Sequence, residues 1–495
     1  MGTFITFPEL LMWLPLLAGF FCFFFKKGTA VKGFATAASL VVLAISVTSL
    51  FYADAQYETY NKVNYVWMKQ IGNSLFLGLD STGRLLTLLT AIAFPVIFIA
   101  TQKRSYKNPG AFYGLMLLTQ AGLMGVFVAL DALVFYFFWE LALIPVYFLC
   151  SKWGGEKRIQ ATFKFFVYTF AGSLLMLAGI LYVYMHTPER AYDGGIAAHS
   201  FALQSFMSAS LTAGEQNWLF WLFFIAFAIK MPVFPFHTWQ PDTYDQSPTS
   251  VTMVLSGVMV KMGLFGVIRW LIPVMPEASV NFANIVIILC IIGILYASCI
   301  AMVQDNIKKL IAYSSIAHIG LMCAALFSFN ELSTQGAIIQ LFSHGINIIG
   351  MWIVVDILER QTGVKNISQL GGVAQKAPVL TIFLVIIALA NIALPLTNAF
   401  VGEFMMFGGL FSVNPLYAVA AGISIILAAV YTLQMIRKVF YGEIVETTST
   451  IKDISFGEKT ALFGLVLFIF LFGIMPQPMI DFTKDALKNI LAVVR

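Results

Sequence analysis

Runs of about twenty consecutive apolar residues recur along almost the whole chain of 495 residues. A helix of roughly 20 residues is needed to cross a hydrocarbon core of about 30 Å. A transmembrane β-barrel would instead show alternating segments of about ten residues, a pattern that the sequence lacks. Charged residues make up 11% of the chain, whereas a soluble domain typically has about 25%. The sequence therefore predicts an all-α polytopic membrane protein.

The apolar runs predict about fourteen transmembrane helices. The first is followed by Lys26 and Lys27, so its positive charges stand on the wrong side for a cleavable signal peptide, and we expect this span to be retained. The predicted spans lie near 7–25, 33–52, 80–101, 111–130, 132–151, 163–186, 217–246, 248–272, 281–303, 308–328, 334–356, 378–412, 416–436 and 460–476.

Two of these spans contain helix-breaking prolines. Pro232 and Pro235 remove backbone donors from the seventh span, and Pro395 interrupts a twelfth apolar run that is too long for one crossing. The two broken spans lie five apart in span order, which is typical of inverted-repeat transporters with a site at the breaks. The sequence therefore predicts N-terminal helices in 1–110, two inverted five-helix repeats in 111–272 and 273–440, and a last helix with a short tail in 441–495.

The basic residues predict the orientation, because loops on the cytoplasmic side carry an excess of Lys and Arg. With the N-terminus outside, the odd-numbered loops hold 19 of the 29 basic residues. Both termini are therefore expected on the outer, periplasmic side. The net charge of +5 reflects this asymmetry and does not indicate nucleic-acid binding. The 19 residues are Lys26, Lys27, Lys32, Lys103, Arg104, Lys107, Lys152, Lys157, Arg158, Lys164, Lys308, Lys309, Arg360, Lys365, Lys376, Arg437, Lys438, Lys452 and Lys459.

Six ionisable residues stand inside six different predicted spans. A charge within the bilayer costs a few kcal/mol or more, so each of them is a candidate functional group. Two histidines on adjacent spans beside a buried lysine favour a proton relay over isolated core histidines. Structural pairing alone is a weaker explanation for six such groups, because each buried charge needs its own compensation. The candidates are Glu140, Lys230, Lys261, His318, His344 and Glu403.

Other polar features are expected to have structural roles or none. Asp131, Arg84 and Arg269 stand at span ends and are interpreted as interfacial anchors, and the Glu359–Arg360 pair as a structural group. The five cysteines lack the C-x-x-C spacing of zinc and iron–sulfur sites. The sequence also contains no glycine-rich motif for nucleotide binding.

An ion pair between Glu140 and Lys230 would be strong enough to couple to proton transport. At about 4 Å and an effective dielectric of about 20, the attraction between the two charges is about 4 kcal/mol. Moving one charge against roughly 150–200 mV costs about 3.5–4.6 kcal/mol. Making or breaking one such pair can therefore drive one proton uphill, provided that another process drives the rearrangement.

The segment Lys230-Met-Pro-Val-Phe-Pro-Phe-His-Thr-Trp-Gln-Pro-Asp242, together with Lys261-Met-Gly263, resembles the signature of the antiporter-like subunits of respiratory complex I. Multisubunit sodium/proton antiporters share this signature. Ile311–Gly320 and Phe342–Gly345 resemble the tenth- and eleventh-span motifs of the same family. The resemblance covers nearly the whole chain and implies a proton-translocating subunit of NADH:quinone oxidoreductase. A subunit of a sodium/proton antiporter is the alternative, and a passive membrane scaffold is a third hypothesis.

The twelfth span points to one branch of this family. L-type and N-type subunits and the antiporter relatives usually have a lysine there. The M-type branch has the glutamate of Phe-Val-Gly-Glu-Phe, as Phe400–Phe404 do here. An L-type subunit would also continue into a long lateral helix after its last span. Both features favour the M-type branch.

The resemblance also implies roles for the candidate residues. Tyr244 stands where the family often has histidine, so that a water chain would have to replace the imidazole if it served proton uptake. His237 keeps its family position and is a secondary candidate, like Tyr244. The coupled input pair, the central relay, the polar axis and the exit would be Glu140 with Lys230, then Lys261, then His318 with His344, and then Glu403.

The same resemblance implies that this chain binds no cofactor, and that NADH, FMN, iron–sulfur clusters and quinone belong to other subunits. The chain would be a non-redox part of the enzyme, driven by redox chemistry in its neighbours. Its expected partners are the other membrane subunits, especially the L-type and N-type antiporter-like subunits, and lipids, but no nucleic acid. The expected location is the bacterial inner (plasma) membrane.

Overall fold

A computed structural model describes residues 5–53, 55–192 and 196–494 of the chain. Within these ranges, eleven helical segments are long and apolar enough to cross a membrane. They are α2 (Gly28–Leu50), α4 (Ser81–Ala100), α5 (Pro109–Val128), α6 (Ala132–Trp153), α7 (Arg158–Met185), the run α11–α13 (Thr249–Val274), α15 (Ala283–Met302), α16 (Ile307–Phe327), α17 (Glu331–Thr362), α21 (Pro415–Val439) and α22 (Phe456–Ile474).

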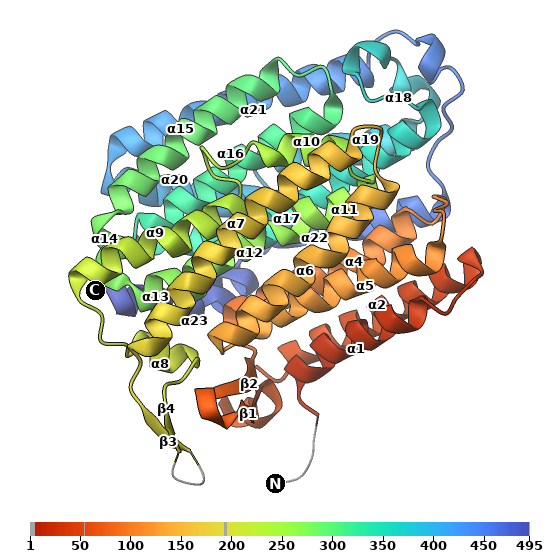
Figure 1. Ribbon diagram of the computed structural model, residues 1–495. Helices are drawn as coiled ribbons and strands as arrows, with labels where there is room; N and C mark the ends of the chain where they lie inside the picture. Colours follow the sequence, from red (N-terminus) through yellow and green to blue (C-terminus); the bar gives the residue numbers. More distant parts are fainter. Residues whose placement is uncertain (1–4, 54, 193–195, 495) are drawn as a thin grey trace.

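The three remaining predicted spans consist of shorter helices. They are α1 (Phe7–Cys22), the broken pair α9 (Ala213–Lys230) and α10 (Trp239–Gln246), and the broken pair α19 (Pro378–Asn391) and α20 (Asn398–Val413). Figure 1 shows these helices lying side by side in one bundle. The predicted all-α membrane fold, with about fourteen spans of which the seventh and twelfth are broken, is confirmed.

The first break follows from the two prolines of the seventh span. Helix α9 ends at Lys230, and regular helix resumes only at Trp239, because Pro232 and Pro235 cannot donate to the helical ladder. Across the break, the Trp239 Nε1 donates a hydrogen bond of 2.9 Å to the carbonyl oxygen of Ile229. This bond satisfies one of the carbonyls that the end of α9 leaves without a helical donor.

The second break separates α19 from α20 at residues 392–397. Ala393 and Leu396 have φ angles of 56° and 72°, a left-handed conformation that costs a non-glycine residue roughly 1–2 kcal/mol. Strained backbone of this kind persists where the surrounding packing determines it, and it is concentrated at functional sites. The packing around the second break therefore holds these residues in their left-handed conformation.

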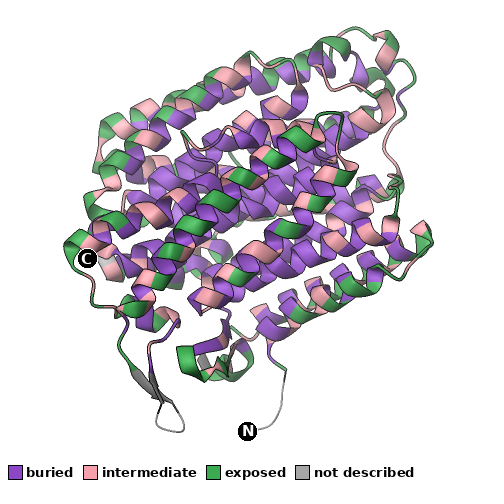
Figure 2. Cartoon of the chain, in the orientation of Figure 1, coloured by how far each residue is buried: buried purple, intermediate pink, exposed green. Residues whose placement is uncertain are grey.

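Helix α17 is the element on which the two halves of the bundle meet. It packs against α4 and α11 (Thr249–Val254) of the first half, residues 5–272, and against α16, α19 and α20 of the second half, residues 273–494. Its 32 residues make it about 48 Å long. Figure 2 shows that the helices in the middle of the bundle are buried, whereas the exposed residues lie on its periphery. Side chains on α17 can therefore connect groups in both halves.

The loops at the end of the bundle near the N-terminus contain two small antiparallel hairpins (Figure 1). In the first, β1 (Lys62–Met68) pairs with β2 (Asn73–Gly78), and in the second, β3 (Arg190–Tyr192) pairs with β4 (Ile196–Ala198). The sequence did not predict these hairpins, although Val, Tyr and Trp in β1 are residues that favour strands. The predicted short tail contains an amphipathic helix, α23 (Gln477–Val494), which packs against α4, α13 and α17.

Asp131 is a buried structural residue and not the interfacial anchor that the sequence suggested. Its Oδ1 accepts hydrogen bonds from the backbone N–H groups of Leu133 and Val134 and so caps α6. The same carboxylate accepts from the Asn73 side chain and from the Ser74 N–H of β2. The first hairpin therefore covers this helix end and removes Asp131 from the surface.

Arg84 and Arg269 are also buried, which corrects their interpretation as interfacial anchors. Arg269 Nη2 lies 2.5 Å from Asp80 Oδ1, and Arg269 also donates to the carbonyl oxygen of Ala129. Arg84 donates to the carbonyl oxygen of Ser49. These arginines join separate helices at the end of the bundle that carries the hairpins.

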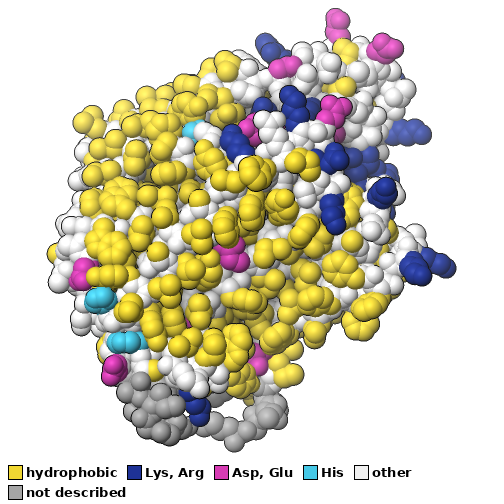
Figure 3. All heavy atoms as spheres, in the orientation of Figure 1, with side chains coloured by type: hydrophobic (Ala, Val, Ile, Leu, Met, Phe, Trp, Pro, Cys, Tyr) yellow, Lys and Arg dark blue, Asp and Glu magenta, His cyan; other side chains and the backbone are white. Residues whose placement is uncertain are grey.

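The basic side chains gather at the opposite end of the bundle, and a broad apolar surface lies between the two ends (Figure 3). Ion pairs join the helices at the basic end. Lys308 Nζ lies 2.8 Å from Glu359 Oε1, and Arg104 Nε lies 3.0 Å from Asp356 Oδ1. Arg360 pairs with Glu458. This geometry agrees with the predicted structural role of Glu359 and Arg360.

Candidate functional site

Lys261 lies in the middle of the bundle and is completely buried. It begins α12 (Lys261–Gly266) directly after a π-helical turn at Leu255–Met259. In this turn the Val260 N–H donates to the carbonyl oxygen of Leu255, five residues earlier. The Lys261 Nζ donates to the Ser256 carbonyl at 2.7 Å. The π-helical turn therefore holds the lysine side chain in place.

His344 of α17 connects Lys261 to the second half of the bundle. Its Nδ1 lies 2.9 Å from Lys261 Nζ, and its Nε2 lies 3.3 Å from the hydroxyl of Ser315 on α16. If the lysine donates to Nδ1, the neutral imidazole carries its proton on Nε2 and can donate to Ser315. The ring centroids of His344 and His318 are 5.6 Å apart. A proton on His344 therefore lies close to the next histidine.

His318 and Glu403 form a direct pair beside the second break. His318 Nδ1 lies 3.0 Å from Glu403 Oε1, and both side chains are at most 9% exposed. The Gln340 Nε2 of α17 donates to the same carboxylate oxygen at 3.2 Å. The structure thus brings Lys261, His344, His318 and Glu403 together in one continuous series. Each member can hold or release a proton, and the separations are those that hydrogen bonds or single waters bridge.

Lys230 ends α9 at the first break and is also buried. Its Nζ has no hydrogen-bond partner among the described residues. It lies 5.4 Å from the ring centroid of Trp139 and 5.8 Å from that of Phe165. Two aromatic faces and the partial negative charge at the C-terminal end of α9 both favour a cation at this position.

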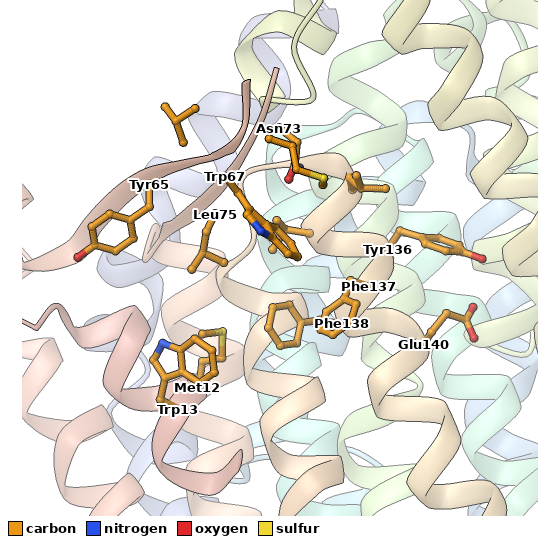
Figure 4. Close-up of a pocket in the computed structure, with 14 residues that line it drawn as sticks. Met12, Trp13, Tyr65, Trp67, Asn73, Leu75, Tyr136, Phe137, Phe138 and Glu140 are labelled. Carbon is orange, nitrogen blue, oxygen red and sulfur yellow. The ribbon is translucent and has the colours of Figure 1, made fainter. Parts of the chain in front are cut away.

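Glu140 and Lys230 do not form the direct ion pair that the sequence analysis considered. Glu140 is half-buried on α6, its Oε1 has no hydrogen-bond partner in the described part of the chain, and it acts on Lys230 only as a nearby charge. It lines one side of an apolar pocket between α1, the first hairpin and α6. Figure 4 shows its side chain turned away from Met12 and Trp13, which line the same pocket. Glu140 therefore stands at the lateral edge of the bundle.

Three buried polar side chains, those of Gln240, Tyr244 and Ser256, form a cluster beside Lys261. Gln240 and Tyr244 share one face of α10, and the Tyr244 hydroxyl faces the side chains of Gln240 and Ser256 without forming a regular hydrogen bond. Buried polar atoms that find no partner in the protein are usually bound to ordered water. Because Ser256 also binds Lys261 through its carbonyl, this cluster is positioned to connect the first break with the central lysine.

His237 lies apart from this cluster. Its ring packs against Phe234 and against Tyr296 of α15, with centroid separations of 5.8 and 5.2 Å. The structure thus places the two secondary candidates differently. Tyr244 adjoins the central lysine through Ser256, whereas His237 faces the aromatic side chains near α15.

Several polar contacts of the site were missed by sequence reasoning. Gln340 stands four residues before His344, and Ser314 stands four residues before His318, so each pair shares one face of its helix. That spacing was available as a signal. The role of the Ser256 carbonyl could not be predicted from the sequence, because it depends on the hydrogen-bond pattern of the π-helical turn.

The family model for the transmembrane segment of NADH:quinone oxidoreductase and Mrp antiporter subunits matches residues 129–428, which include all six candidate residues. The match covers more than half of the chain. The chain therefore belongs to this family of membrane-spanning subunits.

Relatives over the whole length are NADH-quinone oxidoreductase M subunits. The subunit of Rickettsia typhi is 35% identical over 492 residues, and that of Escherichia coli K12 is 32% identical over 501 residues, with 97% of each chain covered in both cases. A chain of respiratory complex I from Thermus thermophilus with bound NADH has a TM-score of 0.89 at 27% identity, covering 98% of this chain and 99% of the other. A chain of the Mrp complex from Dietzia sp. has a TM-score of 0.85 and 99% coverage of both chains, but its 18% identity shows the shared fold alone. The resemblance to the M-type branch is confirmed.

Proposed function

We propose that this chain is a proton-translocating membrane subunit of an NADH:quinone oxidoreductase. The observation that carries the proposal is the buried series in which Lys261 contacts His344 and His318 contacts Glu403. Burying several acidic and basic groups in the middle of an apolar bundle is costly, and such groups therefore mark functional sites such as proton relays. The M-subunit relatives support this function over that of a sodium/proton antiporter subunit.

In the proposed mechanism a proton passes laterally from one buried group to the next. Lys230 receives it at the first break, the polar cluster around Tyr244 conducts it to Lys261, and the two histidines carry it to Glu403. Glu140, at the lateral edge of the bundle, acts on Lys230 electrostatically and changes the cost of charging that lysine. Energy for the cycle comes from redox chemistry in other subunits.

The remaining parts of the proposal concern the assembly. The two repeats comprise 111–272 and 273–440, and L-type and N-type antiporter-like subunits are the neighbours in the membrane. NADH, FMN, iron–sulfur clusters and quinone are bound by other subunits. The location is the bacterial inner membrane with both termini on the periplasmic side, and the gathering of basic side chains at one end of the bundle supports this orientation (Figure 3).

Removing the gene for this chain tests the proposed function. Inverted membrane vesicles from the deletion strain should lose NADH-driven proton uptake, and a plasmid copy should restore it. If NADH-driven uptake survives and a sodium-dependent proton exchange is lost instead, the chain serves an antiporter. A passive scaffold would be indicated if neutral substitutions of Glu140, Lys261 and Glu403 left the restored proton uptake unchanged.

Replacing Tyr244 with phenylalanine should slow coupled NADH oxidation about fivefold, which corresponds to the loss of one hydrogen-bonding group worth about 1 kcal/mol. The substitution removes only the hydroxyl that faces Gln240 and Ser256. Tyr244→His, which keeps a group able to donate and accept, should retain most of the activity. The measurement is the rate of proton uptake per assembled complex.

A matched control is Tyr113→Phe on α5. Tyr113 is as buried as Tyr244, and its hydroxyl has no hydrogen-bond partner among the residues that the structure describes. Its replacement should leave proton uptake unchanged. Equal rates for the Tyr244→Phe and Tyr113→Phe enzymes would show that the Tyr244 hydroxyl takes no part in transfer.

A further inference from the structure

His186 lies at the end of α7, on the side of the bundle that carries the hairpins, and the proposed series does not use it. It directly follows the last residue of α7 and is partly exposed. Its backbone carbonyl oxygen accepts a hydrogen bond of 3.0 Å from the Ser210 N–H, in the segment that leads into α9. Figure 3 shows histidine and acidic side chains close together at this end of the bundle. His186 therefore lies where the end of α7 meets the start of α9.

Both ring nitrogens of His186 face groups that only accept hydrogen bonds. Nδ1 lies 2.9 Å from the backbone carbonyl oxygen of Tyr182, and Nε2 lies 3.6 Å from Glu215 Oε1. A neutral imidazole carries one proton. Because the carbonyl cannot donate, that proton stays on Nδ1, and the lone pair of Nε2 then faces the carboxylate. Only the doubly protonated imidazolium satisfies both contacts.

Glu215 is held as a carboxylate by donors on its other sides. Its Oε2 accepts from the N–H and the hydroxyl of Thr212 at 2.7 and 2.6 Å, and its Oε1 accepts from the Tyr182 hydroxyl at 2.6 Å. Hydrogen bonds donated to a carboxylate favour its ionised form. A negative charge also suits the positive N-terminal end of α9. Glu215 thus presents a fixed negative charge to His186.

Two further features favour a positive charge on His186. It stands at the C-terminal end of α7, where the unpaired carbonyls of a helix carry partial negative charge. Its ring also stacks on that of Tyr182, with the centroids 4.4 Å apart, and an aromatic face attracts a cation.

The other titratable side chains that the structure describes in the loop between α7 and α9 are Glu189 and His199. Glu189 is exposed, and His199 Nδ1 lies 2.6 Å from the carbonyl oxygen of Thr187. Within the described ranges, neither of them forms an ion pair with His186. The charge that faces the His186 ring is therefore that of Glu215 on α9.

We propose that His186 is a pH-sensitive latch on the outer side of the membrane, whose protonation links the start of α9 to the end of α7. This inference rests on the proposed function, which places this end of the bundle in the periplasm and moves protons outwards. An imidazole changes its charge between about pH 5 and 8. The link to Glu215 is present at acidic pH and is lost as the pH rises and Nε2 gives up its proton. Because Lys230 stands at the other end of α9, the proton gradient restrains the helix that carries this lysine.

Hydrogen exchange of the assembled complex in nanodiscs tests the latch. After correction for the intrinsic effect of pH, the amides of 212–218 should be about two- to fivefold better protected at about pH 6 than at about pH 8, which is the contribution of one partly exposed ion pair. His186→Gln and Glu215→Gln should each remove this difference. Glutamine at 215 can still take part in the capping box with Thr212. If Glu215→Gln does not assemble, His186→Gln decides.

His199→Gln is the matched control. The His199 ring also bonds to a backbone carbonyl through Nδ1, but it has no carboxylate partner in the described part of the chain. This variant should keep the full difference in protection between the two pH values. Equal protection at both pH values in the unmodified complex would overturn the latch. So would a difference that persists in His186→Gln or disappears in His199→Gln.

Inverted vesicles, whose lumen corresponds to the periplasm, show whether the latch restrains the pump. With the external pH fixed, lowering the lumen from about pH 8 to about pH 6 should slow proton uptake about twofold more in the unmodified complex than in His186→Gln. The same response in both complexes would overturn the restraint. The exchange measurement does not depend on pumping, so the proposed function fails separately, if Lys261→Met pumps normally.

Discussion

Replacing Lys261 with methionine is expected to reduce NADH-driven proton translocation at least about tenfold in the assembled complex, because a positioned proton-transfer group typically contributes about 10²–10⁴-fold. Lys261 lies in the first half of the bundle, and its Nζ contacts His344 of the second half. Methionine has a similar length and an apolar end that suits a buried position, so the fold should be retained. The measurement is proton uptake by reconstituted vesicles, normalised to the amount of assembled complex.

Arginine at the same position distinguishes proton transfer from the need for a positive charge. A guanidinium group stays protonated in proteins, so Lys261→Arg keeps the charge but cannot release a proton. We expect this variant to assemble and to be as inactive in translocation as Lys261→Met. Normal pumping by the arginine variant would mean that Lys261 acts only through its charge.

Lys308→Met is the matched control for the central lysine. Lys308 is also buried, but its Nζ pairs with Glu359 at the basic end of the bundle, away from the histidines. Its removal leaves Glu359 with one partner fewer, and we expect a lower thermal stability of the complex. The number of protons moved per NADH oxidised by the surviving complex should not change.

Replacing Glu403 with glutamine is expected to have the second large effect, again at least about tenfold on proton translocation. Glutamine has nearly the same shape and can still contact Gln340, but it cannot exchange a proton with His318. Glu403→Asp keeps the carboxylate on a shorter side chain and should retain part of the activity. Proton uptake and NADH oxidation measured together will show whether electron transfer is uncoupled or slowed.

Asp356→Asn is the control for the loss of a buried acid. Asp356 is 2% exposed and pairs with Arg104, outside the series of relay residues. We expect its replacement to weaken the helix contacts at the basic end and to leave the proton-to-electron ratio unchanged. If Glu403→Gln and Asp356→Asn behave alike, Glu403 has a structural role and not a place in the relay.

The candidate residues could be found from the sequence because each is a local anomaly. An ionisable group within an apolar run of about twenty residues is costly wherever it points, and this rule identified Glu140, Lys230, Lys261 and Glu403 without a structure. The prolines of the two breaks act through the lost N–H of their own residue. The existence of each helix therefore follows from a short stretch of chain, but a proline alone does not determine an interruption, because Pro15, Pro95 and Pro145 lie inside continuous helices.

The contacts between these residues could not be found in the same way. His318 pairs with Glu403, which is 85 positions away in the sequence, while Glu140 and Lys230 do not pair directly. Each result depends on how the helices rotate and approach one another. The burial of Asp131 was missed because a hairpin from another loop covers it.

The apolar runs by themselves determined that this protein is a bundle of about fourteen membrane-spanning helices with buried charges. The physical reason is that crossing a hydrocarbon layer constrains the length and polarity of each segment separately. Only the tertiary structure decided which charges meet. Helix α17 packs between the two halves and places His344 against Lys261, and the π-helical turn supplies the carbonyl that orients this lysine. Such contacts arise from packing between distant segments, which no local stretch of sequence encodes.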